Sequence, residues 1–169
     1  MTKRLIIARH GNTFDPGATP RRIGARTDLP LSESGQEQAR NLGIMLHDYR
    51  IYPDRIYVSE LRRTRETARI AFPDAKPEIR SFLNEIDHGP DENKTDDAIS
   101  ARIGEQALQD WNEKNIPPPD WNVNPGFLKT SWQDLADDIA QDETVLAVTS
   151  GGIARFVPDI TDDIETFLK

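Results

Sequence analysis

The sequence predicts an α/β fold, a three-layer sandwich in which helices flank a mainly parallel central sheet. Short apolar runs bounded by charged residues alternate along the chain with longer segments whose apolar residues recur at helical spacing. This alternation is typical of β-α-β units, whose parallel strands are covered by helices on both faces. The length of 169 residues suits one domain with a substantial core. We therefore expect residues 1–169 to form a single domain.

The first half of the chain contains the clearest elements. Residues 5–8 (LIIA) are a continuous apolar run, as in a central strand, and a polar loop rich in Gly, Pro and Arg follows them. Residues 31–50 predict a helix, with Ser32 as its N-cap. A second strand is expected over 55–60, and a second helix over 61–72.

The second half of the chain predicts a further set of elements. A short strand is expected over 78–83, a helix over about 95–114, and another helix over 131–141 whose first residue, a serine, is the cap. The proline-rich stretch 115–127 is expected to be a loop. Residues 144–149 (TVLAVT) predict a buried strand that ends directly before a serine and two glycines.

The composition excludes several classes of protein. The formal net charge of −8 argues against a nucleic-acid binder, which needs a basic face, although a few local arginines could still hold one phosphate. The chain has no cysteine, which excludes disulfides and thiol chemistry, and its three histidines lack metal-ligand spacing. No apolar run approaches the ~20 residues of a membrane span. We expect a cytoplasmic protein without a metal or another cofactor, and without nucleic-acid or membrane partners.

Two short polar motifs follow predicted strands. Arg9, His10 and Gly11 come directly after the first strand, and Ser150 and Gly151 come directly after the last. In open α/β sheets, ligands bind outside the carboxyl ends of the strands. Both motifs are therefore candidates for one site. On spacing alone the histidine motif is weak evidence, because a lone histidine is more often structural.

Four blocks of residues together give the chain a resemblance to a known family. The opening block is Arg9-His10-Gly11 with Thr13, and the second is RIGARTDLPLSESGQEQA at residues 22–39. The third block contains Ser59, Leu61, Arg63, Thr67 and Ala68, and the fourth is LNEIDHG at residues 83–89. Their types and order resemble the histidine phosphatase superfamily, which includes the phosphoglycerate mutases. The resemblance spans nearly the whole chain and implies a phosphoglycerate mutase-like fold.

The resemblance implies a metal-independent phosphatase that forms a phosphohistidine at His10. An unprotonated imidazole is abundant near neutral pH, so His10 suits the role of nucleophile. Arg9 and Arg63 can chelate the phosphate oxygens as planar guanidinium forks, and Glu85 can protonate the leaving oxygen. Without the resemblance, Arg63 would be assigned to a solvated helix face and Glu85 to an exposed loop.

The expected partner is a small phosphorylated substrate or phosphate itself. Six residues are expected to contribute to its binding. They are Gly11, Thr13, Arg22, Arg26, Ser150 and Gly151. Among them, Gly11 would let the backbone pass close to the phosphate, and the two arginines would extend the positive lining. Neither the physiological substrate nor the oligomeric state follows from the sequence.

The chain departs from the family pattern at Ser150, where the family has its second histidine. Loss of one pre-organised donor of this kind typically costs about 10²–10³ in rate. Three interpretations stay open: a slow phosphatase, a phosphatase in which Ser150, Thr149, Arg26 or His88 replaces the missing donor, or a phospho-ligand binder without catalysis. A mutase is less favoured, because its longer inserts and C-terminal tail are absent here. The C-terminal end also looks shortened relative to the family.

Overall fold

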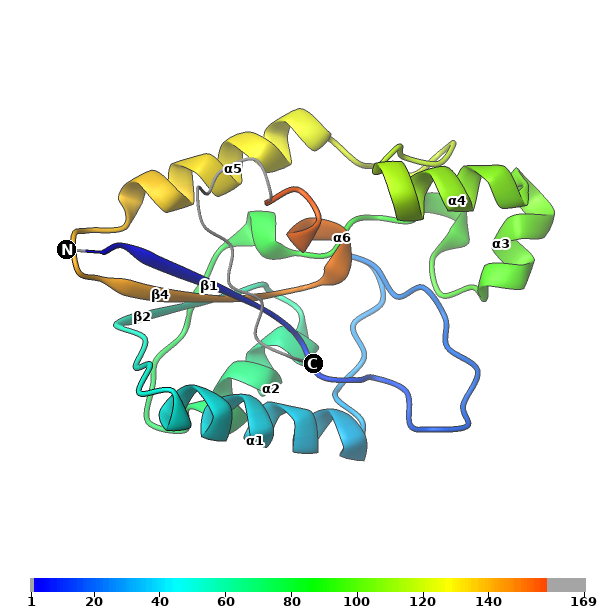
Figure 1. Cartoon of the computed structure of the whole chain (residues 1–169). Coiled ribbons are helices and arrows are strands. Elements are labelled where there is room, and N and C mark those ends of the chain that lie inside the picture. Colours follow the sequence, from blue (N-terminus) through cyan, green and yellow to red (C-terminus); the bar gives the residue numbers. More distant parts are fainter. Residues whose placement is uncertain (1, 158–169) are drawn as a thin grey trace.

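The central sheet of the protein is parallel and has the strand order β1-β4-β2-β3 (Figure 1). The computed structural model describes residues 2–157. The strands are β1 (Arg4–Arg9), β2 (Arg55–Val58), β3 (Glu78–Ile79) and β4 (Thr144–Thr149). The expectation of a shortened C-terminal end concerns residues after 157, which lie outside the described part.

Alternate residues of the strands supply two separate cores, one on each face of the sheet. On one face Ile6, Val58 and Leu146 pack against α1 (Glu33–Asp48) and α2 (Arg62–Ala71). On the other face, residues of opposite phase such as Tyr57 and Val145 pack beneath the helices α5 (Pro125–Asp138) and α6 (Gly151–Ala154). Figure 1 shows the resulting layers of helix, sheet and helix. The expected α/β three-layer sandwich is confirmed.

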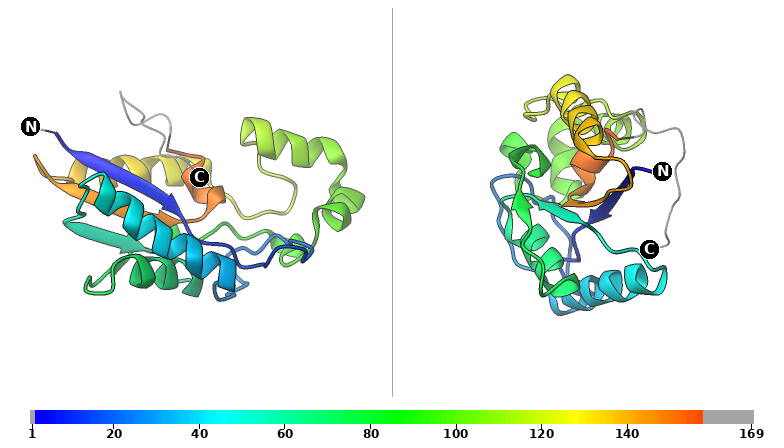
Figure 2. Two further views of the ribbon diagram at one scale, coloured as in Figure 1. Left: turned by 60° about the horizontal axis from the view of Figure 1, so that its bottom comes forward. Right: turned by 90° about the vertical axis from the view of Figure 1, so that its left-hand side faces the viewer.

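The helices α3 (Asp96–Ile103) and α4 (Glu105–Lys114) lie beyond the carboxyl ends of the strands rather than over the sheet (Figure 2). Two 3₁₀ turns, Ser81–Leu83 and Gly89–Asp91, lie on the chain between the sheet and this pair. The buried residues of α3 and α4 join the core under α5 through the rings of Trp111 and Trp121. This pair therefore forms one wall above the edge of the sheet where both motifs lie.

Several sequence-based expectations match the structure. Ser32 is the N-cap of α1 and its hydroxyl accepts a 3.2 Å hydrogen bond from the backbone N–H of Gly35. The two strands expected over 5–8 and 144–149 pair in parallel with each other, but in the described sheet only β4 is central and β1 lies at the edge. Within residues 2–157 no helix has both the length and the apolar character needed to cross a membrane.

Three expectations about helices and strands were wrong. The helix expected over 95–114 is interrupted at Gly104, whose φ of 86° lies outside the helical region. The helix expected from Ser131 begins earlier, because Asn124 caps the backbone N–H of Phe127 and a proline occupies the first turn. The strand expected over 78–83 is only Glu78–Ile79, and a 3₁₀ turn follows it.

Candidate active site

The carboxyl ends of β1 and β4 bring the two polar motifs together. In the ladder, Arg9 lies level with Thr149, and the backbone N–H of His10 donates to the carbonyl of Thr149 at 3.0 Å. The first residue after each strand is thus His10 on one side and Ser150 on the other. The sequence-based expectation that both motifs flank one site agrees with this register.

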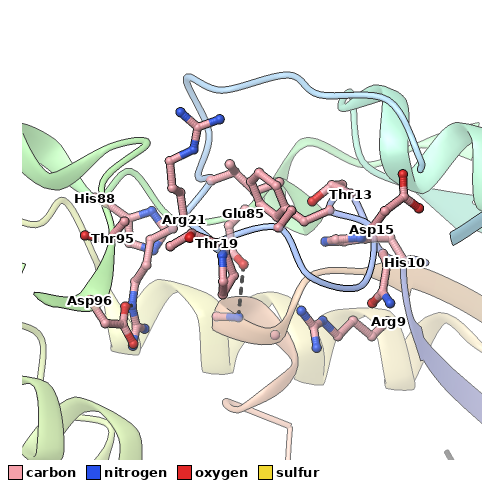
Figure 3. Close-up of a pocket in the computed structure, with 18 of the residues that line it drawn as sticks. Arg9, His10, Thr13, Asp15, Thr19, Arg21, Glu85, His88, Thr95 and Asp96 are labelled. Atoms are coloured by element: carbon pink, nitrogen blue, oxygen red, sulfur yellow. Dashed lines mark hydrogen bonds and ion pairs between the residues drawn. The ribbon is translucent and has the colours of Figure 1, made fainter. Parts of the chain in front are cut away.

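A cavity of about 810 Å³ opens at this edge of the sheet. Its lining comes from Arg9 and His10, from residues 12–23, from Glu85 and His88, from α3 and α4, and from Gly151, Gly152 and Arg155. In the view of Figure 3, Arg9 and His10 stand at one end, His88, Thr95 and Asp96 at the other, and Glu85 between them. The cavity is therefore long enough to present different chemistry at its two ends.

His10 has the geometry of a neutral imidazole with one free nitrogen. Its Nδ1 lies 2.7 Å from the carbonyl oxygen of Gly11, and because a carbonyl only accepts, Nδ1 carries the proton. In the described part of the chain, no group bonds to Nε2. This nitrogen is also not completely buried. Since His10 lines the cavity, the lone pair of Nε2 is open to a ligand there.

The surroundings of His10 keep the ring unprotonated. Burial is the main cause that lowers the pKa of His10 to about 3. The hydrogen bond to Gly11 raises this pKa, whereas the positive charges of Arg63 and Arg9 lower it further. A nucleophilic lone pair is therefore available throughout the neutral and mildly acidic range.

The two arginines expected to hold phosphate have different environments. Arg9 is exposed in the cavity, and its guanidinium has no partner among the described residues (Figure 3). The side chain of Arg63 is fully buried, and it donates to the carbonyls of Thr27 at 2.8 Å and of Ile23 and Gly24 at 3.2 Å each. Arg63 is not part of the cavity lining, but its charge acts on His10 and its Nε has no hydrogen-bond partner.

Glu85 lies in the cavity wall with its carboxylate fixed by the backbone. Its Oε1 accepts from the N–H of Ile86 at 2.9 Å, and its Oε2 accepts from the N–H of Gly152 at 3.3 Å (Figure 3). A Cβ at Gly152 would lie 2.2 Å from Oε1, so a larger residue at this position would displace the carboxylate from its present place. The second glycine of the SGG motif thus has a direct role in placing Glu85.

The residues expected to bind substrate divide into two groups. Thr13, Arg22 and Gly151 line the cavity, whereas Gly11, Arg26 and Ser150 do not. Arg22 forms an ion pair of 2.7 Å with Asp96 of α3, so its charge is already partly balanced. Arg26 is turned away to Asp87 at 2.9 Å.

Gly11 is required for a reason that the sequence did not indicate. Its N–H donates to the hydroxyl of Thr67 at 3.1 Å, and a Cβ here would lie 2.3 Å from the carbonyl oxygen of Gly35. The glycine lets the chain after β1 pack against the first turn of α1. Its role in the described structure is therefore close packing between two segments.

Three buried polar atoms in residues 2–157 have no hydrogen-bond partner. They are Arg63 Nε, His88 Nδ1 and Ser150 Oγ. Such atoms are rare in native structures, and each one calls for an explanation such as a ligand. All three belong to residues at or beside the cavity.

Arg155 and Trp111 are two of the lining residues that the sequence analysis did not assign to the site. Arg155 stacks over the ring of Trp111 at 3.9 Å and donates to the carbonyl of that tryptophan at 2.6 Å. Burial lowers the pKa of Arg155, and the charge of Glu85 opposes that change. An arginine one turn after the SGG motif was the available signal. Trp111 was assigned to the core, and it does have 1% exposure, but its edge also reaches the cavity.

Within the described residues, no group of three or more His, Cys, Asp or Glu side chains has the arrangement of a metal site.

Comparison with known proteins finds phosphoglycerate mutases and phosphatases that are similar to this chain. Over 175 residues it is 28% identical to a 2,3-bisphosphoglycerate-dependent phosphoglycerate mutase of Bifidobacterium longum, covering 100% of this chain and 69% of the relative. A solved mycobacterial glucosyl-3-phosphoglycerate phosphatase in complex with VO₃ has a TM-score of 0.77 and 25% identity, covering 92% of this chain and 80% of the other.

A phosphoserine phosphatase of Entamoeba histolytica, solved with 3-phosphoglyceric acid, has a TM-score of 0.72 at 22% identity, covering 90% of this chain and 76% of the other. This likeness confirms the phosphoglycerate mutase-like fold. Residues 5–160 match the family described as histidine phosphatase superfamily (branch 1). The chain, with its Arg-His-Gly motif at the end of β1, belongs to the histidine phosphatase superfamily.

Proposed function

We propose that this protein is a metal-independent phosphatase that hydrolyses a phosphate monoester through a phosphohistidine at His10. The observation that carries the proposal is the state of His10. Its proton is held on Nδ1 by the carbonyl of Gly11, its pKa is lowered to about 3, and its free Nε2 faces the cavity. This is the arrangement that a nitrogen nucleophile requires.

In the first step, the lone pair of His10 Nε2 attacks phosphorus. The N–P bond forms as the bond from phosphorus to the leaving oxygen breaks, and Glu85 in its protonated form gives its proton to that oxygen. In the second step, Glu85 takes a proton from a water molecule that attacks phosphorus. The N–P bond then breaks, inorganic phosphate leaves, and both His10 and Glu85 return to their starting states.

Cationic groups near His10 support the binding of the phosphoryl oxygens. Within residues 2–157 the guanidinium of Arg9 in the cavity has no partner, and the buried Nε of Arg63 has a hydrogen still to donate. Charge-assisted hydrogen bonds of this kind stabilise a phosphoryl group as its charge redistributes. Thr13 and Gly151 lie in the same lining and complete our proposed phosphate-binding set, with Ser150 Oγ as an additional donor.

Ser150 favours one alternative, a phospho-ligand binding or sensor protein that uses the same cavity without catalysis. A serine carries no charge, so the site lacks the second imidazole that the family pattern has at this position. Against that alternative stands Glu85, since a carboxylate weakens the binding of a phosphate dianion and contributes only if it transfers a proton.

The test is hydrolysis of p-nitrophenyl phosphate with EDTA present, at several values between about pH 5 and 7.5. Wild type is compared with His10→Ala and Ser150→His. We expect slow hydrolysis by wild type, none by His10→Ala, and faster hydrolysis by Ser150→His. If wild type and His10→Ala are equally inactive yet both bind inorganic phosphate, the protein is a binder.

Because the chain is similar to phosphoglycerate mutases, a second experiment with another substrate is needed. The same preparations are incubated with 3-phosphoglycerate, with and without 2,3-bisphosphoglycerate, and products are separated by ³¹P NMR. The phosphatase proposal predicts inorganic phosphate as the product. Net formation of 2-phosphoglycerate, dependent on the bisphosphate, would instead identify a mutase.

A further inference from the structure

Glu92 ties together the segment of chain that surrounds Arg63. Its Oε1 accepts hydrogen bonds from the backbone N–H of Gly24 at 2.7 Å, from the N–H of Arg26 at 3.2 Å and from the hydroxyl of Thr27 at 2.8 Å. One carboxylate oxygen therefore fixes three donors, which belong to residues 24, 26 and 27.

The carbonyls of the same segment hold the guanidinium of Arg63. Thr27 accepts at 2.8 Å, and Ile23 and Gly24 accept at 3.2 Å each. Donors of residues 24, 26 and 27 thus bind Glu92, while the carbonyls of residues 23, 24 and 27 bind Arg63. A shift of this short segment would move the guanidinium with it.

The second oxygen of Glu92 fixes the carboxylate from the other side. Oε2 accepts from the N–H of His88 at 3.1 Å, and it lies 3.4 Å from Nδ1 of the same residue. A Cβ added at Gly24 would lie 2.3 Å from the carbonyl oxygen of Ile86 and 2.5 Å from Oε2. The segment is therefore pressed closely against Glu92.

The protonation of Glu92 agrees with this role. Burial alone would raise the pKa of Glu92, but hydrogen bonds from His88, Thr27 and Gly24 outweigh that effect and lower the pKa to about 2. The carboxylate is ionised, and it accepts all of these hydrogen bonds, at any pH at which the protein would work.

We propose that Glu92 is a positioning residue for Arg63. Glu92 fixes the backbone of residues 23–27, and this backbone holds the guanidinium of Arg63 where it can reach a phosphoryl group bound at His10. The inference rests on the proposed function, since it assigns Glu92 to the same phosphate site. Glu92 itself contacts neither substrate nor His10. Its effect on phosphate binding passes through the segment that it fixes.

The first measurement is the affinity for inorganic phosphate, by isothermal titration calorimetry, with KM and kcat for p-nitrophenyl phosphate beside it. Glu92→Ala is expected to weaken phosphate binding about 10- to 100-fold, because small displacements of a binding group have effects of this size. The matched control is Glu66→Ala. Glu66 accepts from the N–H of Leu31 at 2.8 Å in the same loop, but it bonds neither to residues 23–27 nor to Arg63.

Glu92→Gln separates position from charge. The amide oxygen can keep the bonds from residues 24, 26 and 27. The amide nitrogen, placed where Oε2 accepts from the N–H of His88, loses that one bond but can donate to Nδ1 of His88. We expect Glu92→Gln to retain phosphate affinity within about threefold of wild type, since the positioning contacts persist. If Glu92→Gln is as weak as Glu92→Ala, the negative charge and not the position is what matters, and the proposal is overturned.

A double-mutant cycle with Arg63→Lys tests whether the effect passes through Arg63. In the Arg63→Lys background, Glu92→Ala is expected to cost less than about threefold in phosphate affinity. Additive effects overturn the proposal, and so does a loss in Glu66→Ala equal to that in Glu92→Ala. Should Glu92→Ala fail to fold, Thr27→Val removes one bond to Glu92 at nearly constant volume and takes its place in the cycle.

The outcomes for this inference and for the proposed function are distinct. A wild type that forms a phosphohistidine, with Glu92→Ala unchanged in phosphate affinity, contradicts the positioning role alone. A wild type that binds phosphate and shows the coupling but never hydrolyses an ester contradicts the phosphatase and supports the positioning role. A wild type that does not bind phosphate at all contradicts both.

Discussion

The backbone N–H of His10 donates a 3.0 Å hydrogen bond to the carbonyl oxygen of Thr149. This bond continues the parallel ladder of β1 and β4 one step past the end of β1, so the chain is still fixed where the imidazole begins. A nucleophile attached to the end of a hydrogen-bonded strand is held more precisely than one on a free loop. Gly11, the next residue, then lets the chain pack against the first turn of α1.

The imidazole of His10 is expected to stay neutral far below the usual range. Because burial lowers its pKa to about 3, its ring resonances should not change between pH 8 and about pH 4. The measurement is a ¹H-¹³C NMR titration of the free protein, in which the His10 signal is the one missing from His10→Gln. A midpoint for His10 near 6.5, the ordinary value, would contradict the burial of the ring.

The lowered pKa of His10 also makes the stability of the protein depend on pH. In the unfolded chain the pKa of His10 is 6.5, and in the folded protein it is about 3, so between these values the unfolded state binds the extra proton. The free energy of unfolding should therefore fall as the pH drops from about 6.5 toward 3, by at most about 1.4 kcal/mol per pH unit from this group.

Urea denaturation at several pH values between about 7.5 and 4.5 measures this contribution as the difference between wild type and His10→Gln. The glutamine does not titrate, so its stability should fall less steeply with acid. Parallel curves for the two proteins would show that His10 is solvated in the folded state.

Gly152→Ala is expected to impair the transfer of a proton to the leaving group. The new Cβ would lie 2.2 Å from Oε1 of Glu85 and displace that carboxylate. Loss of general acid catalysis costs about 10²–10⁴ when the leaving group is a poor one. We therefore expect a large fall in kcat with an alkyl phosphate, and a much smaller one with p-nitrophenyl phosphate, whose leaving group needs little protonation.

Comparison of the two substrates on one protein sample is the internal control, because misfolding would lower both rates equally. Equal losses on both substrates would show that Gly152 does not act through Glu85.

The start of α5 can be tested through its cap. Asn124 accepts from the N–H of Phe127 at 3.0 Å, whereas the hydroxyl of Ser131 donates to the carbonyl of Phe127 within the helix. Asn124→Ala should lower the free energy of unfolding by about 1 kcal/mol, the usual value of an N-cap. Ser131→Ala should change it by less than about 0.5 kcal/mol. If urea denaturation shows a larger loss of stability for Ser131→Ala than for Asn124→Ala, the helix begins at Ser131, as the sequence predicted.

Local patterns were sufficient to predict the strands β1, β2 and β4 and the layers, but not the extent of β3. Apolar runs such as 5–8 and 144–149 have one interpretation in an α/β protein, and the carboxyl ends of the resulting strands locate the site. The break at Gly104 could not be predicted with the same certainty. A single glycine is tolerated in many helices, and only the packing of α3 and α4 over the cavity decides that this one breaks it.

The contacts within the site were the least accessible from the sequence. Arg63 was identified by its motif, but its burial among the carbonyls of residues 23–27 depends on a loop far away in the chain. Glu92 carries no motif, because most of its partners are backbone N–H groups and any sequence can supply those. Arg22 and Arg26 looked equivalent in sequence, yet carboxylates on different elements, Asp96 and Asp87, set their directions.

The central claim is that His10 accepts the phosphoryl group, and trapping that adduct tests it most directly. Wild type and His10→Gln are mixed with substrate in the presence of EDTA, quenched with alkali within the first turnovers, and examined by ³¹P NMR and by mass spectrometry of their peptides. The account predicts an acid-labile, alkali-stable phosphoryl group on Nε2 of His10 in wild type and none in the variant. Hydrolysis that proceeds without this adduct, or a phosphoryl group on another residue, would contradict it.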